Sequence, residues 1–138
     1  MDVRAARADD IDAILRLWRD ADAVESVTDD PESIRILLDT PTGALFVAES
    51  DGVLIGTIVA GFDGWRGSVY RLAVLPAHRR RGVALALVAQ AERFLAGAGA
   101  RKMAAMVMRD HGHALRFWEA AGYDEDTRLA RYVKVVER

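Results

Sequence analysis

The apolar residues of the first forty positions recur with a helical period. Spacings of i, i+3, i+4 and i+7 predict a helix that a side chain of Asp9 or Asp10 caps. Its apolar stripe consists of Ile11, Ile14, Leu15 and Trp18. A second short helix is predicted from Pro31, because proline favours the first helical position. The residues that this helix buries are Ile34, Leu37 and Leu38.

The middle of the chain changes to patterns that are typical of strands. Residues 3–6 predict a short first strand, and residues 44–49 and 53–60 predict two more. Ser50-Asp51-Gly52 separates the last two and favours a hairpin. The glycine-rich segment 61–67 predicts a turn or loop. A strand over residues 69–75 follows, and Pro76 ends it.

The second half returns to helical spacing. An apolar stripe from residue 83 predicts a helix that Gly97-Ala98-Gly99 closes. Residues 103–108 predict a strand, a last helix ends at Gly122, and Tyr123 and residues 129–136 supply closing strands. The predicted order is β-α-α-β-β-β-α-β-α-β-β. This order indicates an α/β (α+β) fold with a mixed sheet and helices on its faces.

The composition of the chain excludes several classes of function. At 138 residues, 51% of them hydrophobic, the chain is expected to form one domain over residues 1–138. A net charge of −2 gives no general attraction to nucleic acid or to an anionic membrane. The absence of cysteine excludes disulfides, thiolate metal sites and a cysteine acyl-enzyme, and it agrees with a cytoplasmic protein. No apolar run approaches the roughly 18 residues of a membrane span.

The segment Arg79-Arg80-Arg81-Gly82-Val83-Ala84 opens a helix shortly after a strand. A helix start leaves N–H groups unpaired, and its dipole favours an anion. Small residues let a ligand approach the backbone, and three arginines add positive charge. The pattern favours a pyrophosphate site. It matches neither a Walker A loop nor G-x-G-x-x-G. A solvated basic turn is the alternative, but cations at a helix N-terminus oppose the dipole.

This segment resembles the Q/R-x-x-G-x-G/A motif of the GCN5-related N-acetyltransferase (GNAT) superfamily, with Arg79, Gly82 and Ala84 at the defined positions. Residues 111–123 are similar to the same family's N-x-x-A-x-x-(L/F)-Y-E-x-x-G-(F/Y) pattern. Residues 61–68 are also similar to uncharacterised bacterial acetyltransferases of the YpeA-like kind. The element order matches over nearly the whole chain.

The resemblance implies a fold, a reaction and a cofactor. It implies that acetyl-coenzyme A donates an acetyl group to an amine by direct attack in a ternary complex. The backbone of Leu72, Ala73 and Val74 would pair with pantetheine like an added strand. The pyrophosphate would be held by Arg79, Arg80, Arg81, Gly82, Val83 and Ala84. Further cofactor contacts would come from His111, Phe117 and Trp118.

The catalytic residues are less well defined by the sequence. The amine must be neutral, so a base or a water path must take its proton, and a backbone N–H can stabilise the oxyanion. Trp118 stands where many relatives have tyrosine, and an indole N–H cannot act as an acid. Tyr70 and Tyr123 are the nearest substitutes, and Tyr123 stands at a core position of the family. The catalytic candidates are therefore Tyr70 and Trp118, although Trp118 equally suits packing.

Two segments are candidates for acceptor binding. Asp63, Trp65 and Arg66 lie on the glycine-rich loop, for which an ordinary turn is the alternative. Asp29 and Asp30 lie in an acidic stretch that borders the acceptor groove in the family. We therefore expect a cationic acceptor such as a polyamine, lysine or a peptide amine. A solvated acidic face remains the alternative.

Two other functions are compatible with the sequence. A GNAT fold that senses acyl-coenzyme A without turnover is the second hypothesis, because the family's acid is missing at Trp118. A nucleic-acid contact through the three arginines ranks last, since they supply few phosphate contacts. The histidines lack the clustering and carboxylate partners of a metal site. Either a monomer or a homodimer is compatible with the sequence.

Overall fold

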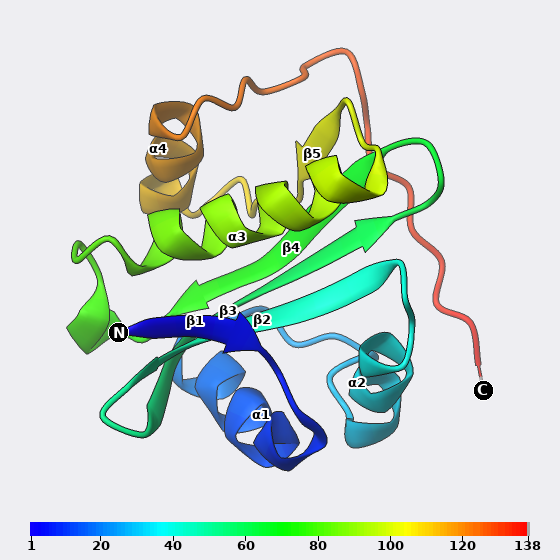
Figure 1. Ribbon diagram of the computed structural model, residues 1–138. Coiled ribbons are helices and arrows are strands. Elements are labelled where there is room, and N and C mark those ends of the chain that lie inside the picture. Colours follow the sequence, from blue (N-terminus) through cyan, green and yellow to red (C-terminus); the bar gives the residue numbers. More distant parts are fainter. Residues whose placement is uncertain (138) are drawn as a thin grey trace. The chain divides into compact units, whose positions relative to one another are not determined.

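A computed structural model of the protein describes residues 1–137 (Figure 1). Its contacts divide the chain into two compact units, one over Met1–Met106 and one from Val107 onward. The single domain expected over residues 1–138 stays a prediction. The elements are β1 (Asp2–Ala5), α1 (Ile11–Asp20), α2 (Pro31–Leu38), β2 (Gly43–Ser50), β3 (Val53–Phe62), β4 (Gly67–Val74), α3 (Val83–Ala98), β5 (Met103–Ala105) and α4 (Gly112–Ala120).

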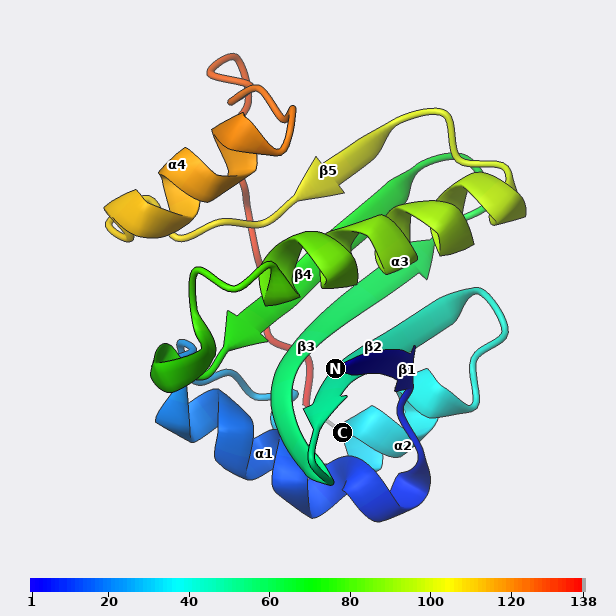
Figure 2. The same cartoon turned by 60° about the vertical axis from the view of Figure 1, so that its left-hand side comes forward.

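The first unit contains one mixed sheet of five strands in the order β1-β2-β3-β4-β5 (Figure 2). Strands β1 to β4 pair in antiparallel fashion, whereas β5 runs parallel to β4. The hairpin between β2 and β3 is confirmed: Asp51 and Gly52 have φ angles of 51° and 77°. Positive φ at both central residues defines a type I′ turn, which matches the twist of the flanking strands.

Helices cover both faces of this sheet. Helix α3 lies close to one face, because a Cβ atom on Gly56 would approach Leu87 and Val83 to 3.0 and 3.1 Å. Helices α1 and α2 cover the other face (Figure 2). Their packing forms a cluster that includes Ile14, which is fully buried, and Ile34. The mixed α/β fold predicted from the sequence is confirmed.

Asp10 begins α1, as expected, but its side chain does not cap the helix. Its Oδ2 accepts from the N–H of Arg7 and from Arg4, both at 2.8 Å. Arg4 also binds Glu49 on β2 at 2.8 Å. These hydrogen bonds, led by the one from Arg4, hold the pKa of Asp10 below its ordinary value. The residue therefore ties the start of α1 to the sheet.

The second unit consists of α4 and an irregular segment. Trp118 is buried, and it contacts Phe117 and Tyr123 edge to face, with ring centroids 5.5 and 4.8 Å apart. The hydrogen bond from the N–H of Tyr123 to the carbonyl oxygen of Trp118 closes the helix end at 3.0 Å. Tyr123 is thus part of a small aromatic cluster.

The two closing strands expected at Tyr123 and residues 129–136 are wrong. Among the described residues no strand follows β5, and β5 itself is shorter than the expected 103–108. The large apolar side chains of residues 129–136 are exposed to solvent; Tyr132 is 93% exposed and Val133 is 72% exposed. Strand-forming residues need a neighbouring strand to bury them, and this requirement outweighed their propensity. Tyr123 instead packs on Trp118.

Candidate active site

A bulge interrupts strand β4. Thr57 on β3 pairs with Ala73 and Val59 pairs with Tyr70, so Arg71 and Leu72 together face a single β3 residue. Arg71 adopts a φ of 54°, in the left-handed region that residues with a side chain rarely occupy. Such a bulge bends its strand and changes where the backbone groups point.

The outer edge of β4 lies open beyond this region. Pairing with β5 ends at Val69 and Ala105, while β4 continues to Val74. The N–H of Leu75 donates to the carbonyl oxygen of Ile55 on β3 at 2.9 Å, so by alternation Ala73 also faces β3. Leu72 and Val74 then face the edge where no strand of the described residues pairs. Of the three residues predicted to bind pantetheine, these two have the required direction.

The predicted pyrophosphate segment follows directly. A short 3-10 turn, Pro76–His78, leads from β4 to four exposed residues, Arg79, Arg80, Arg81 and Gly82. The Arg79 side chain turns back: its Nε donates to the carbonyl oxygen of Val74 at 3.0 Å, and an Nη donates to that of Ala21 at 3.3 Å. Arg79 therefore fixes the loop, and Arg80 and Arg81 form no ion pair with the described residues.

Gly82 forms the start of α3. It has φ 81° and caps the helix without a side chain, and its carbonyl oxygen accepts the first helical bond, from Ala86 at 3.1 Å. The N–H groups of Val83, Ala84 and Leu85 consequently have no carbonyl partner within the helix. A Cβ atom on Gly82 would meet nothing within 4 Å. The helix start therefore has no side-chain cap, and Gly82 itself is exposed, as an anion site requires.

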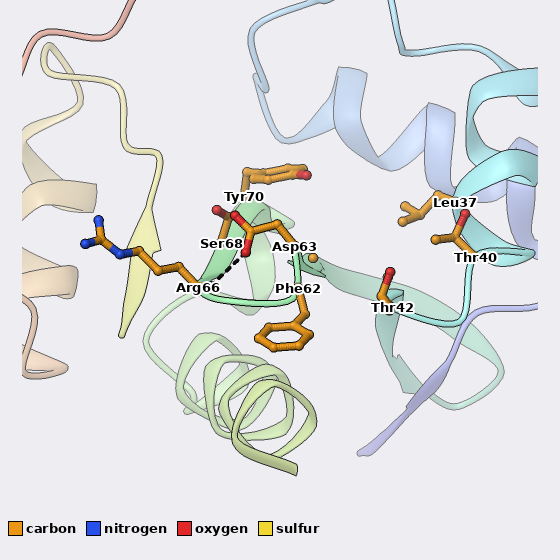
Figure 3. A pocket seen from close by; sticks show the side chains of 10 residues that line it. Leu37, Thr40, Thr42, Phe62, Asp63, Arg66, Ser68 and Tyr70 are labelled. Atoms are coloured by element: carbon orange, nitrogen blue, oxygen red, sulfur yellow. Dashed lines mark hydrogen bonds between the residues drawn. The ribbon is translucent and has the colours of Figure 1, made fainter. Parts of the chain in front are cut away.

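A hollow of about 300 Å³ lies on the side of the sheet that α1 and α2 cover (Figure 3). Tyr70, Ser68 and Asp63 stand on one side of it, and Leu37, Thr40 and Thr42 stand opposite. Its remaining lining comes from Gly43, Gly61, Phe62 and Arg66. Tyr70 is 41% exposed and is the last β4 residue paired before the bulge. This tyrosine therefore belongs both to the hollow and to the bulged strand.

The loop between β3 and β4 borders this hollow. Asp63 Oδ1 accepts from the N–H groups of Arg66 and Trp65 at 2.7 and 2.9 Å, which holds the pKa of Asp63 below its ordinary value. The guanidinium of Arg66 stacks on the Trp65 ring at 4.1 Å, and it extends away from the other labelled side chains (Figure 3). Asp63 thus orders a turn, and Trp65, which is 72% exposed, does not line the hollow.

The two acidic candidates have structural partners. Both carboxylate oxygens of Asp29 accept from one Nη of Arg71, at 2.7 and 2.9 Å. Asp30 is the N-cap of α2, where its Oδ1 accepts from the N–H of Ser33 at 2.7 Å. The charge of Asp29 is therefore already compensated inside the protein. Sequence reasoning missed Arg71, although a charged residue in an apolar strand was a visible signal.

The remaining predicted contacts lie in the second unit. His111 begins α4 without a side-chain cap, and its ring stacks on that of His113 at 5.8 Å. Trp118 is only 7% exposed in its aromatic cluster, and Phe117 is half-buried beside it. Their contacts with a cofactor stay predictions. The described residues contain no group of His, Asp and Glu suited to a metal ion.

Comparison with known proteins matches this chain to acetyltransferases. Residues 11–123 match the family model described as acetyltransferase (GNAT) family. The chain is 34% identical over 124 residues to the acetyltransferase ECA0875 of Pectobacterium atrosepticum, a match that covers 90% of this chain and 88% of that one.

Solved structures agree with this result. The apo aminoglycoside 6'-N-acetyltransferase AAC(6')-IG of Acinetobacter haemolyticus shares the fold, with a TM-score of 0.82, 23% identity, and coverage of 99% of this chain and 100% of that one. The aminoglycoside N-acetyltransferase AAC(6')-Iy in complex with CoA is 25% identical, with a TM-score of 0.79 and coverage of 96% and 93%. None of the described helices is long and apolar enough to cross a membrane.

Proposed function

The chain belongs to the acetyltransferase (GNAT) family, and we propose that it transfers the acetyl group of acetyl-coenzyme A to the amine of a small molecule bound beside Tyr70. Acetyl-coenzyme A is the donor that this family uses.

One observation carries the proposal: the open edge of β4 leads directly to the uncapped start of α3. The backbone of Leu72 and Val74 faces that edge, although the carbonyl oxygen of Val74 is already bound by Arg79. The amides of Val83 and Ala84, nine and ten residues after Val74, have no partner within the helix and suit the pyrophosphate. The exposed guanidinium groups of Arg80 and Arg81 add charge that nothing in the described chain neutralises.

The hollow supports a small-molecule acceptor. Its walls carry the hydroxyl groups of Thr40, Thr42, Ser68 and Tyr70, which can bind a polar molecule through hydrogen bonds. A volume of about 300 Å³ lies at the lower end of ligand pockets, which suits a small acceptor or the end of a longer one. The solved relatives named above are aminoglycoside acetyltransferases, which also favours a polar amine acceptor. Because Asp29 is neutralised by Arg71, we no longer assign it to acceptor binding.

In the reaction the amine nitrogen bonds to the carbonyl carbon, the carbon–sulfur bond breaks, and the amine loses one proton to solvent water, which balances the proton that the leaving sulfur gains through Tyr70. The N–H of Leu72, directed to the open edge after the bulge, is suited to stabilise negative charge on the carbonyl oxygen. The Tyr70 hydroxyl lies on the neighbouring part of β4 and is our candidate to give a proton to the leaving sulfur. Trp118 cannot supply that proton, because its indole N–H is not acidic in this range.

The test is thiol release from acetyl-coenzyme A with a panel of amines that includes polyamines, amino sugars, lysine and a peptide amine. The proposal predicts release above background with at least one small amine and competition by that amine's acetylated product. Binding of coenzyme A without any release would instead support the alternative, a sensing module. The cytoplasmic location, the oligomeric state and the absence of a nucleic-acid partner stay predictions from the sequence.

A further inference from the structure

Strand β4 carries an unusual backbone conformation at a residue with a long charged side chain. Arg71 has φ 54°, and glycine or asparagine occupies such positions far more readily than arginine. A strained residue of this kind persists only where its surroundings hold it. The contacts of Arg71 show what holds it.

The side chain of Arg71 is held from two directions. One Nη donates to both carboxylate oxygens of Asp29, in the loop between α1 and α2. Its guanidinium carbon also lies 4.9 Å from the centroid of the Trp18 ring on α1. The side chains of Arg71 and Asp29 are only 17% and 14% exposed, so solvent screens this ion pair weakly.

The backbone of Arg71 is held by Thr57 on β3, which is hydrogen-bonded in turn to Trp18 on α1. Thr57 on β3 is fully buried, and its hydroxyl donates to the carbonyl oxygen of Arg71 at 2.9 Å. The same hydroxyl accepts from the indole Nε1 of Trp18 at 2.9 Å. Trp18 therefore contacts the guanidinium of Arg71 with its ring face and is linked to the carbonyl oxygen of Arg71 through the hydroxyl of Thr57. Thr57 is also one of only two buried polar residues among those described.

We propose that Trp18, Asp29, Thr57 and Arg71 form a clamp that fixes the β4 bulge and so aims the N–H of Leu72. The inference rests on the proposed function, in which that N–H faces the reacting carbonyl. Arg71 is in this account a positioning residue that acts through the adjacent peptide group. The clamp also joins the acidic loop of residues 21–30 to the reacting strand.

The experiment compares Asp29→Asn, Arg71→Ala and Arg71→Gly with the control Glu49→Gln. The control breaks another part-buried arginine pair of the same sheet, between Arg4 on β1 and Glu49 on β2. Two properties are measured: the amide NMR shifts and hydrogen exchange of Leu72 and Ala73 in the ligand-free protein, and kcat together with the dissociation constant of coenzyme A.

Asp29→Asn and Arg71→Ala are expected to shift both amides, speed their exchange and lower kcat by about 10- to 100-fold. Coenzyme A affinity should fall by a smaller factor than kcat, because the proposed pyrophosphate contacts at α3 do not depend on the bulge. Arg71→Gly should lie closer to the wild type than Arg71→Ala in both properties, since glycine adopts positive φ without a clamp. Glu49→Gln should change neither amide.

Unshifted amides in Asp29→Asn, or shifted amides with an unchanged kcat, would overturn the clamp. So would an Arg71→Gly variant no better than Arg71→Ala. A failure of the proposed function is recognised separately, since it shows as absent thiol release in the wild-type protein. The amide measurements need no ligand and report on the bulge in either case.

Discussion

Arg79 donates through Nε to the carbonyl oxygen of Val74, five residues earlier, at a distance of 3.0 Å. This bond ties the loop before α3 to the end of β4. A second bond, from an Nη of Arg79 to the carbonyl oxygen of Ala21, reaches the end of α1. The first arginine of the basic run thus holds the loop in place, while Arg80 and Arg81 remain exposed, as the proposed anion site requires.

Arg79→Ala and Arg81→Ala should therefore have different effects on the stability of the protein and on coenzyme A binding. Loss of two hydrogen bonds should lower the free energy of unfolding of Arg79→Ala by about 1–3 kcal/mol. Arg81→Ala should change it by less than about 0.5 kcal/mol, as is usual at an exposed site. Arg81→Ala should nevertheless weaken coenzyme A binding and reduce its salt dependence. Urea unfolding and calorimetric titration measure the two effects, and equal destabilisation by both variants would contradict these roles.

Gly82 should be required for its backbone conformation as well as for its size. Its φ of 81° makes Gly82→Ala less stable by about 1 kcal/mol, whereas Gly82→Asn should lose less, since asparagine tolerates this region. A Cβ atom at this position would meet no protein atom within 4 Å. If both variants bind coenzyme A more weakly than the wild type, the added side chain therefore clashes with the ligand. Unchanged affinity in both would place the pyrophosphate elsewhere.

Tyr70→Phe removes the hydroxyl group that we assign as proton donor. The expected result is a fall in kcat of about 100-fold, in the range of general acid catalysis, with little change in coenzyme A affinity. Tyr132→Phe is the matched control, because it removes the same hydroxyl group from a side chain that is 93% exposed and does not line the hollow. Initial rates with saturating donor measure both variants. If Tyr70→Phe retains wild-type kcat with every active amine, Tyr70 is not the acid.

The stability of the protein should fall in acid partly through Asp10. Arg4 holds the folded-state pKa of Asp10 below its unfolded value, so the folded chain binds this proton less readily than the unfolded chain. The stabilisation is therefore complete above the unfolded pKa of about 4 and is lost as the pH falls through the folded pKa. Below about pH 4, the free energy of unfolding should therefore depend less steeply on pH in Asp10→Asn than in the wild type. A variant with the wild-type slope in urea unfolding between neutral and acid pH would contradict this assignment.

Local patterns were sufficient to predict most of the fold. The i, i+3, i+4 spacing placed α1, Pro31 placed the start of α2, and Asp51-Gly52 placed the hairpin, because each signal acts within a few residues. The closing strands failed for the opposite reason. A strand over residues 129–136 depends on a distant pairing partner, and apolar alternation alone cannot supply one.

In the candidate site, too, the features set by nearby residues were predictable and those set by distant residues were not. The uncapped start of α3 at Gly82 was predictable, because a helix start and its small residue are local features. The ion pair between Asp29 and Arg71 was not, because 42 residues separate the partners along the chain. The sequence consequently suggested only that Asp29 binds the acceptor, which stays a prediction, and gave no sign of its ion pair with Arg71.

The most direct test of the central claim is the melting temperature of the purified protein with acetyl-coenzyme A, coenzyme A, ATP and NADH, each at the same concentration. A ligand at a hundredfold its dissociation constant stabilises the folded state by about 2.7 kcal/mol, a shift of several degrees in a domain of this size. We predict a shift with the two coenzyme A species alone. The absence of a shift with both would contradict a pyrophosphate site at the start of α3.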